Sequence, residues 1–394
     1  MKNTPFYTRV GLLCLFLGLV IAFSSCNSSS RKVNHSILPA HNLVEDAKGF
    51  ELYPSNEGYS ILHIINPFEE NDTLKYILLP KQVKTPKQFE HLSRISVPVK
   101  NIAALSSTHI GMLAALNSSK TISGVSNLNY VGNSTVQERA QEGNVLEIGQ
   151  NGQLNYENIL QSHTEVILSI GMQASNYQEH PALKPMQVSV IPVAEWQETT
   201  ALGRAEWIKL IGTLVGKEKE AITYYTYLKR EWERYTALVS HDSTPNPKII
   251  VGAPFKDVWH IPAGNSFKAH LYQAAKGDYL WADSKGEGSL PLSLETVYPK
   301  ALQANIWLDA GFVHSIEELT LKDERFKNFP VIKTGEVYAP IKQIAPNGVN
   351  LFWENSVTTP HLLLADYIRI FHPGILENDS MVFYQKLPLT SYSN

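Results

Sequence analysis

Short apolar runs, separated by stretches with helical spacing, constrain the fold of this chain more than any other feature of its sequence. Fully apolar runs of this length are typical of strands buried on both faces of a parallel sheet. The stretches "THIGMLAALN" and "NYENILQSH" between them place apolar residues three and four apart, as in amphipathic helices. We therefore predict an α/β fold. The apolar runs of the first half are 102–106, 121–126, 165–171 and 188–193.

The second half of the chain repeats this theme. Residues 154–171 and 292–311 both begin with Leu-x-x-Glu or a close equivalent, continue through a helical turn, and end in an apolar strand followed by glycine. In such units a helix leads to a parallel strand whose carboxyl end faces a ligand cleft. We expect two doubly wound lobes. The predicted strands of the second half are 248–254, 258–264, 304–311 and 336–341.

A proline-free stretch of nearly forty residues joins the two halves, with apolar or aromatic residues recurring at three and four. We predict one long, rigid interlobe helix over 203–242, ended by "STPNP" because proline cannot continue a helix. Aromatic and β-branched runs broken by polar turns predict a small antiparallel β element at 48–93. The two lobes are expected at 94–202 and 243–394.

The N-terminal 25 residues have the organisation of a secretory signal. Lys2 and Arg9 precede an apolar run, Val10 to Phe23, that is shorter than the about 20 residues of a membrane-spanning helix. Ser24 and Ser25 then precede Cys26. This order resembles a bacterial lipoprotein signal peptide at 1–25, which implies that Cys26 is lipidated and that a serine-rich tether at 26–47 follows. An uncleaved anchor helix is the alternative.

Composition excludes several classes of protein. The other cysteine, Cys14, lies inside the signal, so the mature chain has no pair of cysteines for an internal disulfide. The formal charge is −3 and no basic run occurs, which argues against a nucleic-acid partner. No Gly-x-Ser-x-Gly, glycine-rich phosphate loop or His-Glu-x-x-His motif is found, so an enzyme is disfavoured.

The ordered set of segments resembles the periplasmic binding proteins for siderophores, haem and cobalamin, over roughly residues 94 to 376. The segments are the signal, "NIAALSSTHIGMLAALN", "NYENILQSHTEVILSIG", "LGRAEWIKLIGTLVGKE", "SLPLSLETVYPKALQANIWLDAG" and "LLLADYIRIFHP". The resemblance implies a monomeric, lipid-anchored periplasmic protein, without a cofactor of its own, that captures a metal chelate between its lobes. It also implies an ABC importer permease as partner. An iron–siderophore or haem complex is the preferred ligand.

Candidate ligand-binding residues follow from the rule that ligands lie beyond the carboxyl ends of parallel strands. In the first lobe, Ser107 and His109 follow the strand at 102–106. Tyr130 follows the next strand, and Asn151 lies in "IGQNGQ". Some hydroxamate-siderophore binders carry an arginine about there, whereas this chain has Gln150 and Asn151, which weakens the case for anionic oxygen recognition by arginine and favours a neutral or differently charged ligand. Helix capping and core packing are the alternative roles for these residues.

In the second lobe, aromatic and imidazole groups gather near predicted strands. Trp259 and Trp281 are candidates for flat walls against a tetrapyrrole or catecholate, with lobe core as their alternative. His260 accompanies Trp259. His109 and His260 could meet across the cleft to bind zinc or manganese, whereas one such histidine alone could ligate chelated iron. Trp353 lies in a glycine-containing loop, where it could close the cleft.

Permease docking in this family uses an exposed carboxylate on each lobe. By position, Glu179 is the candidate in the first lobe, and Glu317 or Glu318 is the candidate in the second. Each could equally be a solvated surface acid. Alternatives for the whole protein are a cobalamin binder, a free zinc or manganese binder, a tetrapyrrole chelatase-like enzyme and an adhesive surface lipoprotein. The histidines show no paired spacing typical of a metal site.

Overall fold

The computed structural model describes residues 41–150, 153–178, 180–256, 258–311, 313–376 and 380–390. They belong to one compact unit that spans Pro39–Asn394. The predicted signal at 1–25, with Cys26, and most of the predicted tether lie outside the described residues. None of the helices within the described ranges combines the length and the apolar character that crossing a lipid bilayer requires.

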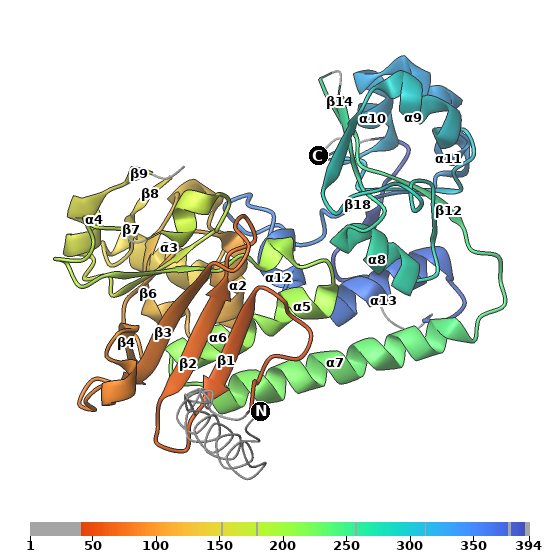
Figure 1. Ribbon diagram of the computed structural model, residues 1–394. Helices are drawn as coiled ribbons and strands as arrows, with labels where there is room; N and C mark the ends of the chain where they lie inside the picture. Colours follow the sequence, from red (N-terminus) through yellow and green to blue (C-terminus); the bar gives the residue numbers. More distant parts are fainter. Residues whose placement is uncertain are drawn as a thin grey trace, which may run out of the picture. The chain divides into compact units, whose positions relative to one another are not determined.

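A four-stranded sheet precedes the two lobes (Figure 1). Three of its strands are antiparallel neighbours, as predicted, but the fourth pairs in parallel with the third and continues past residue 93. The connection over residues 81–92 explains this difference, because about a dozen residues allow the chain to return and run in the same direction. The strands are β1 (Phe50–Pro54), β2 (Ser60–Ile65), β3 (Thr73–Pro80) and β4 (Ser93–Val97).

The first lobe contains a five-stranded parallel sheet in the order β11-β10-β5-β6-β7. All four apolar runs predicted as strands in this half lie in it. Its helices begin at capped positions, where the side chains of Ser106, Asn133 and Asn155 accept hydrogen bonds from backbone amides of the first turn. The elements are β5 (Ile102–Ala104), α2 (Ser107–Ala115), β6 (Ile122–Val125), α3 (Ser134–Gln141), β7 (Leu146–Glu147), β8 (Gly149–Gln150), β9 (Gln153–Leu154), α4 (Tyr156–Gln161), β10 (Val166–Ser169) and β11 (Ser189–Pro192).

The predicted long interlobe helix is present, but it is shorter than the predicted range 203–242, because the first part of that range forms two short helices. α5 (Ala201–Glu206) and α6 (Ile208–Leu214) are short, and α7 (Glu218–Ser240) is the one long helix, drawn in green in Figure 1. The main break lies at Gly216, which has a φ of +73°. There the amide of Gly216 bonds to the carbonyl of Thr213, and that of Lys217 to Gly212, which is the Schellman arrangement that ends helices. α6 and α7 then pack against each other.

The second lobe has a second five-stranded sheet, in the order β15-β12-β17-β18-β19. Its first four members are parallel and β19 is antiparallel. The strand predicted at 258–264 forms, as β14, but it belongs to a separate antiparallel sheet, β13-β14-β16. The strands are β12 (Lys248–Val251), β13 (Pro254–Phe255), β14 (Val258–Pro262), β15 (Asp278–Tyr279), β16 (Ser289–Leu292), β17 (Ile306–Leu308), β18 (Val337–Ala339) and β19 (Gln385–Lys386).

Helices complete this lobe and lead back to the first. α12 packs against α2 of the first lobe, and α13 packs against α7. Pro330 and Pro360 stand at the first helical position of α11 and α13, where the missing amide hydrogen costs nothing. The helices are α8 (Phe267–Ala274), α9 (Leu294–Ala301), α10 (Ile316–Lys322), α11 (Pro330–Thr334), α12 (Phe352–Ser356) and α13 (Pro360–Phe371).

Each lobe is built on its own hydrophobic core, and the four-stranded sheet shares the core of the first. Phe50, Leu52 and Leu62 from that sheet pack in one cluster with Ile102 and Leu168 of the first lobe. The second lobe has a separate cluster that contains Trp307 and Phe326. The β1–β4 sheet is therefore an integral part of the first lobe's packing.

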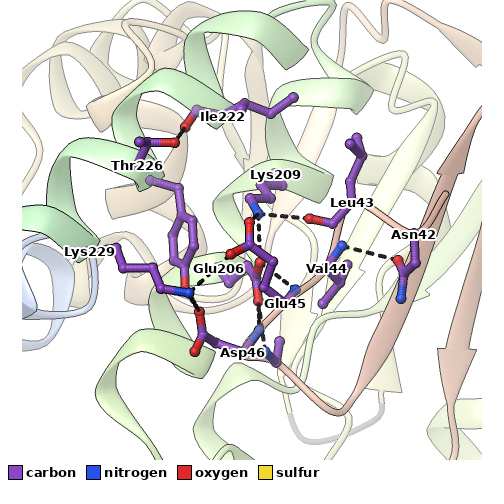
Figure 2. Close-up of polar contacts among 12 residues, drawn as sticks. Asn42, Leu43, Val44, Glu45, Asp46, Glu206, Lys209, Ile222, Thr226 and Lys229 are labelled. Carbon is purple, nitrogen blue, oxygen red and sulfur yellow. Dashed lines mark hydrogen bonds and ion pairs between the residues drawn. The ribbon is translucent and has the colours of Figure 1, made fainter.

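Two buried carboxylates, Glu206 and Glu198, hold the segment 43–49 beside the interlobe helices, and Figure 2 shows the contacts of Glu206. Glu206 accepts hydrogen bonds from the amides of Glu45, Asp46 and Ala47 at 2.6–2.8 Å. Its side chain also lies 2.6 Å from Nζ of Lys209. Glu198 accepts in the same way from the amides of Lys48 and Gly49 and from the indole nitrogen of Trp207. The chain is thus fixed to α5 and α6 immediately before β1.

Candidate functional site

Large apolar side chains remain exposed in the loops that follow the parallel strands of both lobes. In doubly wound sheets this is the edge where ligands bind. Exposed Met172 and Trp353 are typical: one follows β10, and the other lies on α12 after β18. Burying such side chains against a ligand releases apolar surface from water and stabilises a complex. The exposed set is Tyr130, Met172 and Trp196 in the first lobe, and Phe255, Ile344 and Trp353 in the second.

The loops after β10 and β11 are fastened to each other. The indole nitrogen of Trp196 donates to the carbonyl of Ile170 at 2.8 Å, and the side-chain amide of Gln197 donates to the carbonyl of Gly171 at 3.3 Å. Gly171 has a φ of +65°, and a Cβ there would lie 2.8 Å from the hydroxyl of Tyr177. Trp196 therefore presents its exposed ring from a fixed position.

The β2–β3 loop reaches the same region. The ring of Phe68, in this loop, contacts the ring of Tyr177 edge-on, with centroids 6.0 Å apart. Tyr177 itself lies beneath Gly171. The sheet that precedes the lobes thus helps to support the loop that carries Met172.

A buried charged cluster lies behind these loops and joins α2, the loop after β11, and α5. Nε2 of His109 donates to the carbonyl of Val193 at 3.1 Å and lies 3.6 Å from Glu195. Burial raises the pKa of Glu195, but His109 and Arg204 nearby outweigh it, so the pKa falls below its usual value. Arg204 lies 4.0 Å from Glu195 and places its guanidinium 4.4 Å from the ring of Phe267 in the second lobe.

A second polar cluster lies at the carboxyl end of β17. Asp309, which directly follows this strand, accepts hydrogen bonds from Nζ of Lys268 at 3.0 Å and from the hydroxyl of Tyr384. Burial lowers the pKa of Lys268, but the Asp309 carboxylate raises it above its usual value, so the amine is positively charged. Nζ of Lys268 also lies 5.8 Å from the ring of Trp353. A cation is thus held beside an exposed aromatic ring.

A cavity touches both lobes near Arg204, Phe267 and Trp353, but its volume is only about 10 Å³. That is room for about one water molecule. In this conformation the cavity therefore admits no chelate, and a ligand at this place must contact the exposed faces of the loops or separate them. The remaining wall residues are Ala201, Ser356, Val357 and Pro360.

The second lobe also contacts the first through the loop that carries Trp353. The side-chain amide of Asn347 donates to the carbonyl of Val131 at 2.9 Å. Glu354, on α12 just after this loop, is buried. Burial raises its pKa to about 7 despite hydrogen bonds from Asn133 and Gly132. Its backbone carbonyl presses so close to Gly111 of α2 that a Cβ there would lie 1.8 Å away.

The ligand-binding residues predicted in the first lobe differ in how far they are exposed. Tyr130 is exposed, as a stacking residue requires. Ser107 is half-buried at the first position of α2, whereas Ser106 is the residue that caps this helix. His109 is fully buried in the cluster with Glu195, so it does not face a cleft and does not meet His260. Asn151 lies outside the described residues.

In the second lobe, the predicted aromatic walls are core residues. Trp259 has no exposed surface, stacks on Trp307 and donates its indole hydrogen to the carbonyl of Val251. Trp281 is also buried, against Tyr279 and the amine of Lys300. His260 is exposed, but it lies on β14 in the separate antiparallel sheet and not at the edge where the parallel strands end.

Trp353 is the one aromatic residue predicted for the second lobe that lies at the carboxyl-end edge, and 48% of its surface is exposed.

The carboxylates proposed for permease docking remain predictions. Glu317 is exposed and Glu318 half-buried in the first turn of α10, where Oε2 of Glu318 accepts from the amide of His314. Glu179 lies outside the described residues.

Sequence reasoning missed several residues of this edge. Met172, Trp196, Arg204, Lys268 and Asp309 were not among the candidates. Met172 and Trp196 come within three or four residues of the ends of β10 and β11, so extending each predicted strand by its loop would have found them. Arg204 and Lys268 lie on helices, and the approach of Arg204 to Phe267 and of Lys268 to Trp353 is visible only in three dimensions.

Within the described ranges, no group of three or more histidine, cysteine or acidic side chains could hold a metal ion.

Solved structures share this fold at low sequence identity. A TroA-like periplasmic binding protein, FepB, from Veillonella parvula aligns with a TM-score of 0.54 and 16% identity, over 74% of this chain and 96% of its own. A periplasmic heme binding protein from Pseudomonas aeruginosa aligns with a TM-score of 0.53 and 14% identity, over 74% and 99%. CeuE of Helicobacter pylori, solved with Ni(II) bound, gives 0.54 and 14%, over 73% and 88%.

Sequence comparison adds relatives of similar length and a family. Two uncharacterized lipoproteins of Methanocaldococcus jannaschii are 22% and 25% identical, over 96% and 95% of this chain and 95% and 98% of their own lengths. Residues 102–341, more than half of the chain, match the family model described as periplasmic binding protein. The match covers the parallel sheets and the interlobe helices described above. The chain therefore belongs to the periplasmic binding protein family.

Proposed function

We propose that this protein is the substrate-binding component of an ABC importer and that it captures a metal chelate, preferably an iron–siderophore or haem complex. The observation that carries the proposal is the exposed apolar set at the carboxyl-end edges of both sheets, from Tyr130 to Trp353. A large, stiff ligand can bury several of these side chains at once, and each contact contributes through apolar area. A small polar solute would leave them in water.

Charge favours an anionic chelate. Lys268 stands beside Trp353, and Arg204 stands over Phe267 at the small cavity between the lobes. Siderophore and haem complexes commonly carry carboxylate or other anionic oxygens, which bind strongly to such cations when water is excluded. Cobalamin, whose peripheral side chains are neutral amides, would use these cations less and is the runner-up.

The protein's partners follow from its family. We propose that a lipid on Cys26 anchors the chain to a membrane on the periplasmic side and that a permease receives the ligand. Glu317 or Glu318 in the second lobe and Glu179 in the first are the proposed docking carboxylates. Charged pairs at such a wet interface chiefly set orientation and association rate.

A titration with a matched pair of variants tests the proposal. The soluble chain that starts after Cys26 is titrated with haem, ferric catecholate and hydroxamate chelates, cyanocobalamin and zinc, and quenching of tryptophan fluorescence is recorded. Saturable quenching by one anionic chelate is expected. Trp353→Ala should weaken it at least about tenfold, the equivalent of about 1.4 kcal/mol of buried aromatic contact.

Tyr227→Ala is the control, because Tyr227 is similarly exposed but lies on α7. This variant should bind like the original protein. Saturation by cyanocobalamin or zinc alone would overturn the preferred ligand class. An unchanged affinity in Trp353→Ala would place the site elsewhere, and recovery of a chemically altered tetrapyrrole would support the chelatase alternative.

A further inference from the structure

A second, larger hollow lies away from the carboxyl-end edges. It is a groove of about 1000 Å³, bounded on one side by β3 and β4 and on the other by the first half of β11. Its floor and end include residues that precede β5 and β10, such as Lys100 and Glu165. It therefore lies outside the edge where the proposed chelate site is found. We call it the β4–β11 groove.

Fixed hydrogen bonds hold the two sides of the groove together. The buried hydroxyl of Tyr76, on β3, donates to the carbonyl of Val190, on β11, at 2.8 Å. At the end of the groove the amide of Lys100 lies 3.4 Å from Oε2 of Glu165. The groove is thus a consequence of how the four-stranded sheet is attached to the first lobe.

Both flanking strands are the outermost members of their sheets. β4 ends the order β1-β2-β3-β4, and β11 ends the order β11-β10-β5-β6-β7. An outermost strand leaves backbone amides and carbonyls without a strand neighbour, and an extended segment of another chain can pair with them. Apolar side chains between the polar ones, among them Leu74, Leu92 and Val188, offer contacts for alternate residues of such a segment.

The lining is strongly cationic, although the whole chain carries a formal charge of −3. Among the residues that the structure describes, its charged members are five basic side chains and one acidic side chain. In the described part of the protein, the amines of Lys75, Lys81 and Lys100 take part in no ion pair or hydrogen bond. The charged lining residues are Lys75, Lys81, Arg94, Lys100, Lys184 and Glu165, with His91 and His180 beside them.

The guanidinium of Arg94, on β4, is held in place within this lining. It donates to the carbonyls of Pro80 and Lys81 at 3.3 and 2.9 Å, and it lies 3.5 Å from the hydroxyl of Thr85. A cation that is already ordered loses little side-chain entropy when it binds an anion. The groove therefore combines one hydrogen-bonded guanidinium with several lysine amines.

From the strand edges and the charge we infer that the β4–β11 groove binds an extended, acidic segment of a partner protein. Backbone pairing along β4 supplies register, and the lysines select acidic side chains. A flat lipid surface cannot enter a groove bounded on both sides, and a polyanion without amides would not use the strand edges. This inference does not depend on which ligand the lobes bind.

Fluorescence anisotropy with a defined peptide tests the inference. The probe is a labelled peptide of about ten residues with alternating glutamate and valine, roughly twice the length of β4. The controls are a peptide with lysine in place of glutamate, polyphosphate, and vesicles of anionic phospholipid. Binding of the acidic peptide alone, weakened by salt, is expected.

Two double variants of equal charge locate the binding. Lys75→Glu with Lys81→Glu should weaken acidic-peptide binding at least about tenfold. Lys285→Glu with Lys333→Glu, at exposed positions of the second lobe, should leave it unchanged. All four lysines are exposed, so circular dichroism should show both variants folded.

Three results would overturn the inference: no binding of the acidic peptide, equal loss in both double variants, or tighter binding of vesicles or polyphosphate than of the peptide. Chelate titration of the same variants separates the two proposals. The groove variants should keep chelate binding, so failure of one proposal leaves the other standing.

Discussion

Glu206 is a carboxylate with no exposed surface, and its two oxygens accept hydrogen bonds from three consecutive backbone amides and from Lys209 (Figure 2). Lys209 is itself nearly fully buried and lies over the ring of Tyr225 at 4.4 Å. Such a pair is stable only while both charges and their hydrogen-bond partners are present. Glu206 therefore holds residues 45–47 against the interlobe helices.

Glu206→Gln should therefore lower the free energy of unfolding by about 3–5 kcal/mol, because it leaves the buried Lys209 charge with only the half-exposed Glu45 as an anion and turns one acceptor into a donor. Urea denaturation followed by circular dichroism measures this. Glu233→Gln, at an exposed position of α7, should change it by less than about 0.5 kcal/mol. Equal stability of the two variants would show that the carboxylate does not hold the 43–49 segment.

Glu354 predicts a pH dependence of stability. Burial raises its pKa to about 7, above the ordinary value of 4.5 that applies in the unfolded chain. Between these values the folded protein keeps a proton that the unfolded chain has lost, so stability falls as the pH rises through this window and levels off above it. The contribution is about 3 kcal/mol in total.

Glu354→Gln should remove this contribution and make the protein more stable than the original at pH 8, with little difference at pH 4.5. Unfolding free energies at the two pH values give the comparison. A parallel pH dependence in the variant and the original protein would contradict the assignment to Glu354.

At the scale of elements, α2 of the first lobe and α12 of the second lie in close contact. Gly111 lies on α2 under the carbonyl of Glu354, and any Cβ at this position would overlap that oxygen. The two helices can approach only because residue 111 has no side chain. Gly111 was part of a predicted helix, but nothing in its local sequence marked it as a contact point.

Gly111→Ala should separate α2 from α12 and cost about 1–3 kcal/mol of stability, even though alanine favours a helix more than glycine does. Thermal and urea unfolding check this. Gly288→Ala is the control, because a Cβ there has no neighbour within 4 Å and should be tolerated. A stabilised Gly111→Ala variant would mean that helix propensity outweighs the contact.

At the scale of the whole molecule, the two lobes share three connecting helices and a loop that returns from the second lobe to the first. α7 packs on α6 and on α13, so it is supported at both ends. A rigid connection of this kind permits small movements of the lobes, which suits a largely preformed site. The membrane anchor proposed at Cys26 would hold this unit near its permease.

Cys26→Ser should move the protein from the membrane fraction to the soluble periplasmic fraction, because serine has no thiol to carry the lipid. Fractionation followed by immunoblotting measures the distribution. Cys14→Ser is the matched control: it alters the only other cysteine, inside the apolar run of the signal, and should leave the protein in the membrane fraction. Retention of Cys26→Ser at the membrane would favour the uncleaved anchor helix.

Local pattern was enough to predict the α/β class, four of the five strands in the first lobe's parallel sheet, and the family. Runs such as 102–106 and 165–171 are apolar because both faces of their strands are buried. Burial on both faces requires consecutive apolar residues, and such a run can be recognised in the sequence. Gly216 could also have predicted the break between α6 and α7, because glycine often ends helices. The helical spacing of apolar residues continues across Gly216, however, and indicated a single helix.

The tertiary structure alone decided which aromatic residues are available to a ligand. Trp259 and Trp353 both stand near predicted strands, yet one stacks on Trp307 inside the core and the other is half-exposed. An indole favours either environment, because its apolar face gains from burial and its single donor needs only one partner. Which one it takes depends on neighbours distant in the chain, and for the same reason the β4–β11 groove has no signature in sequence.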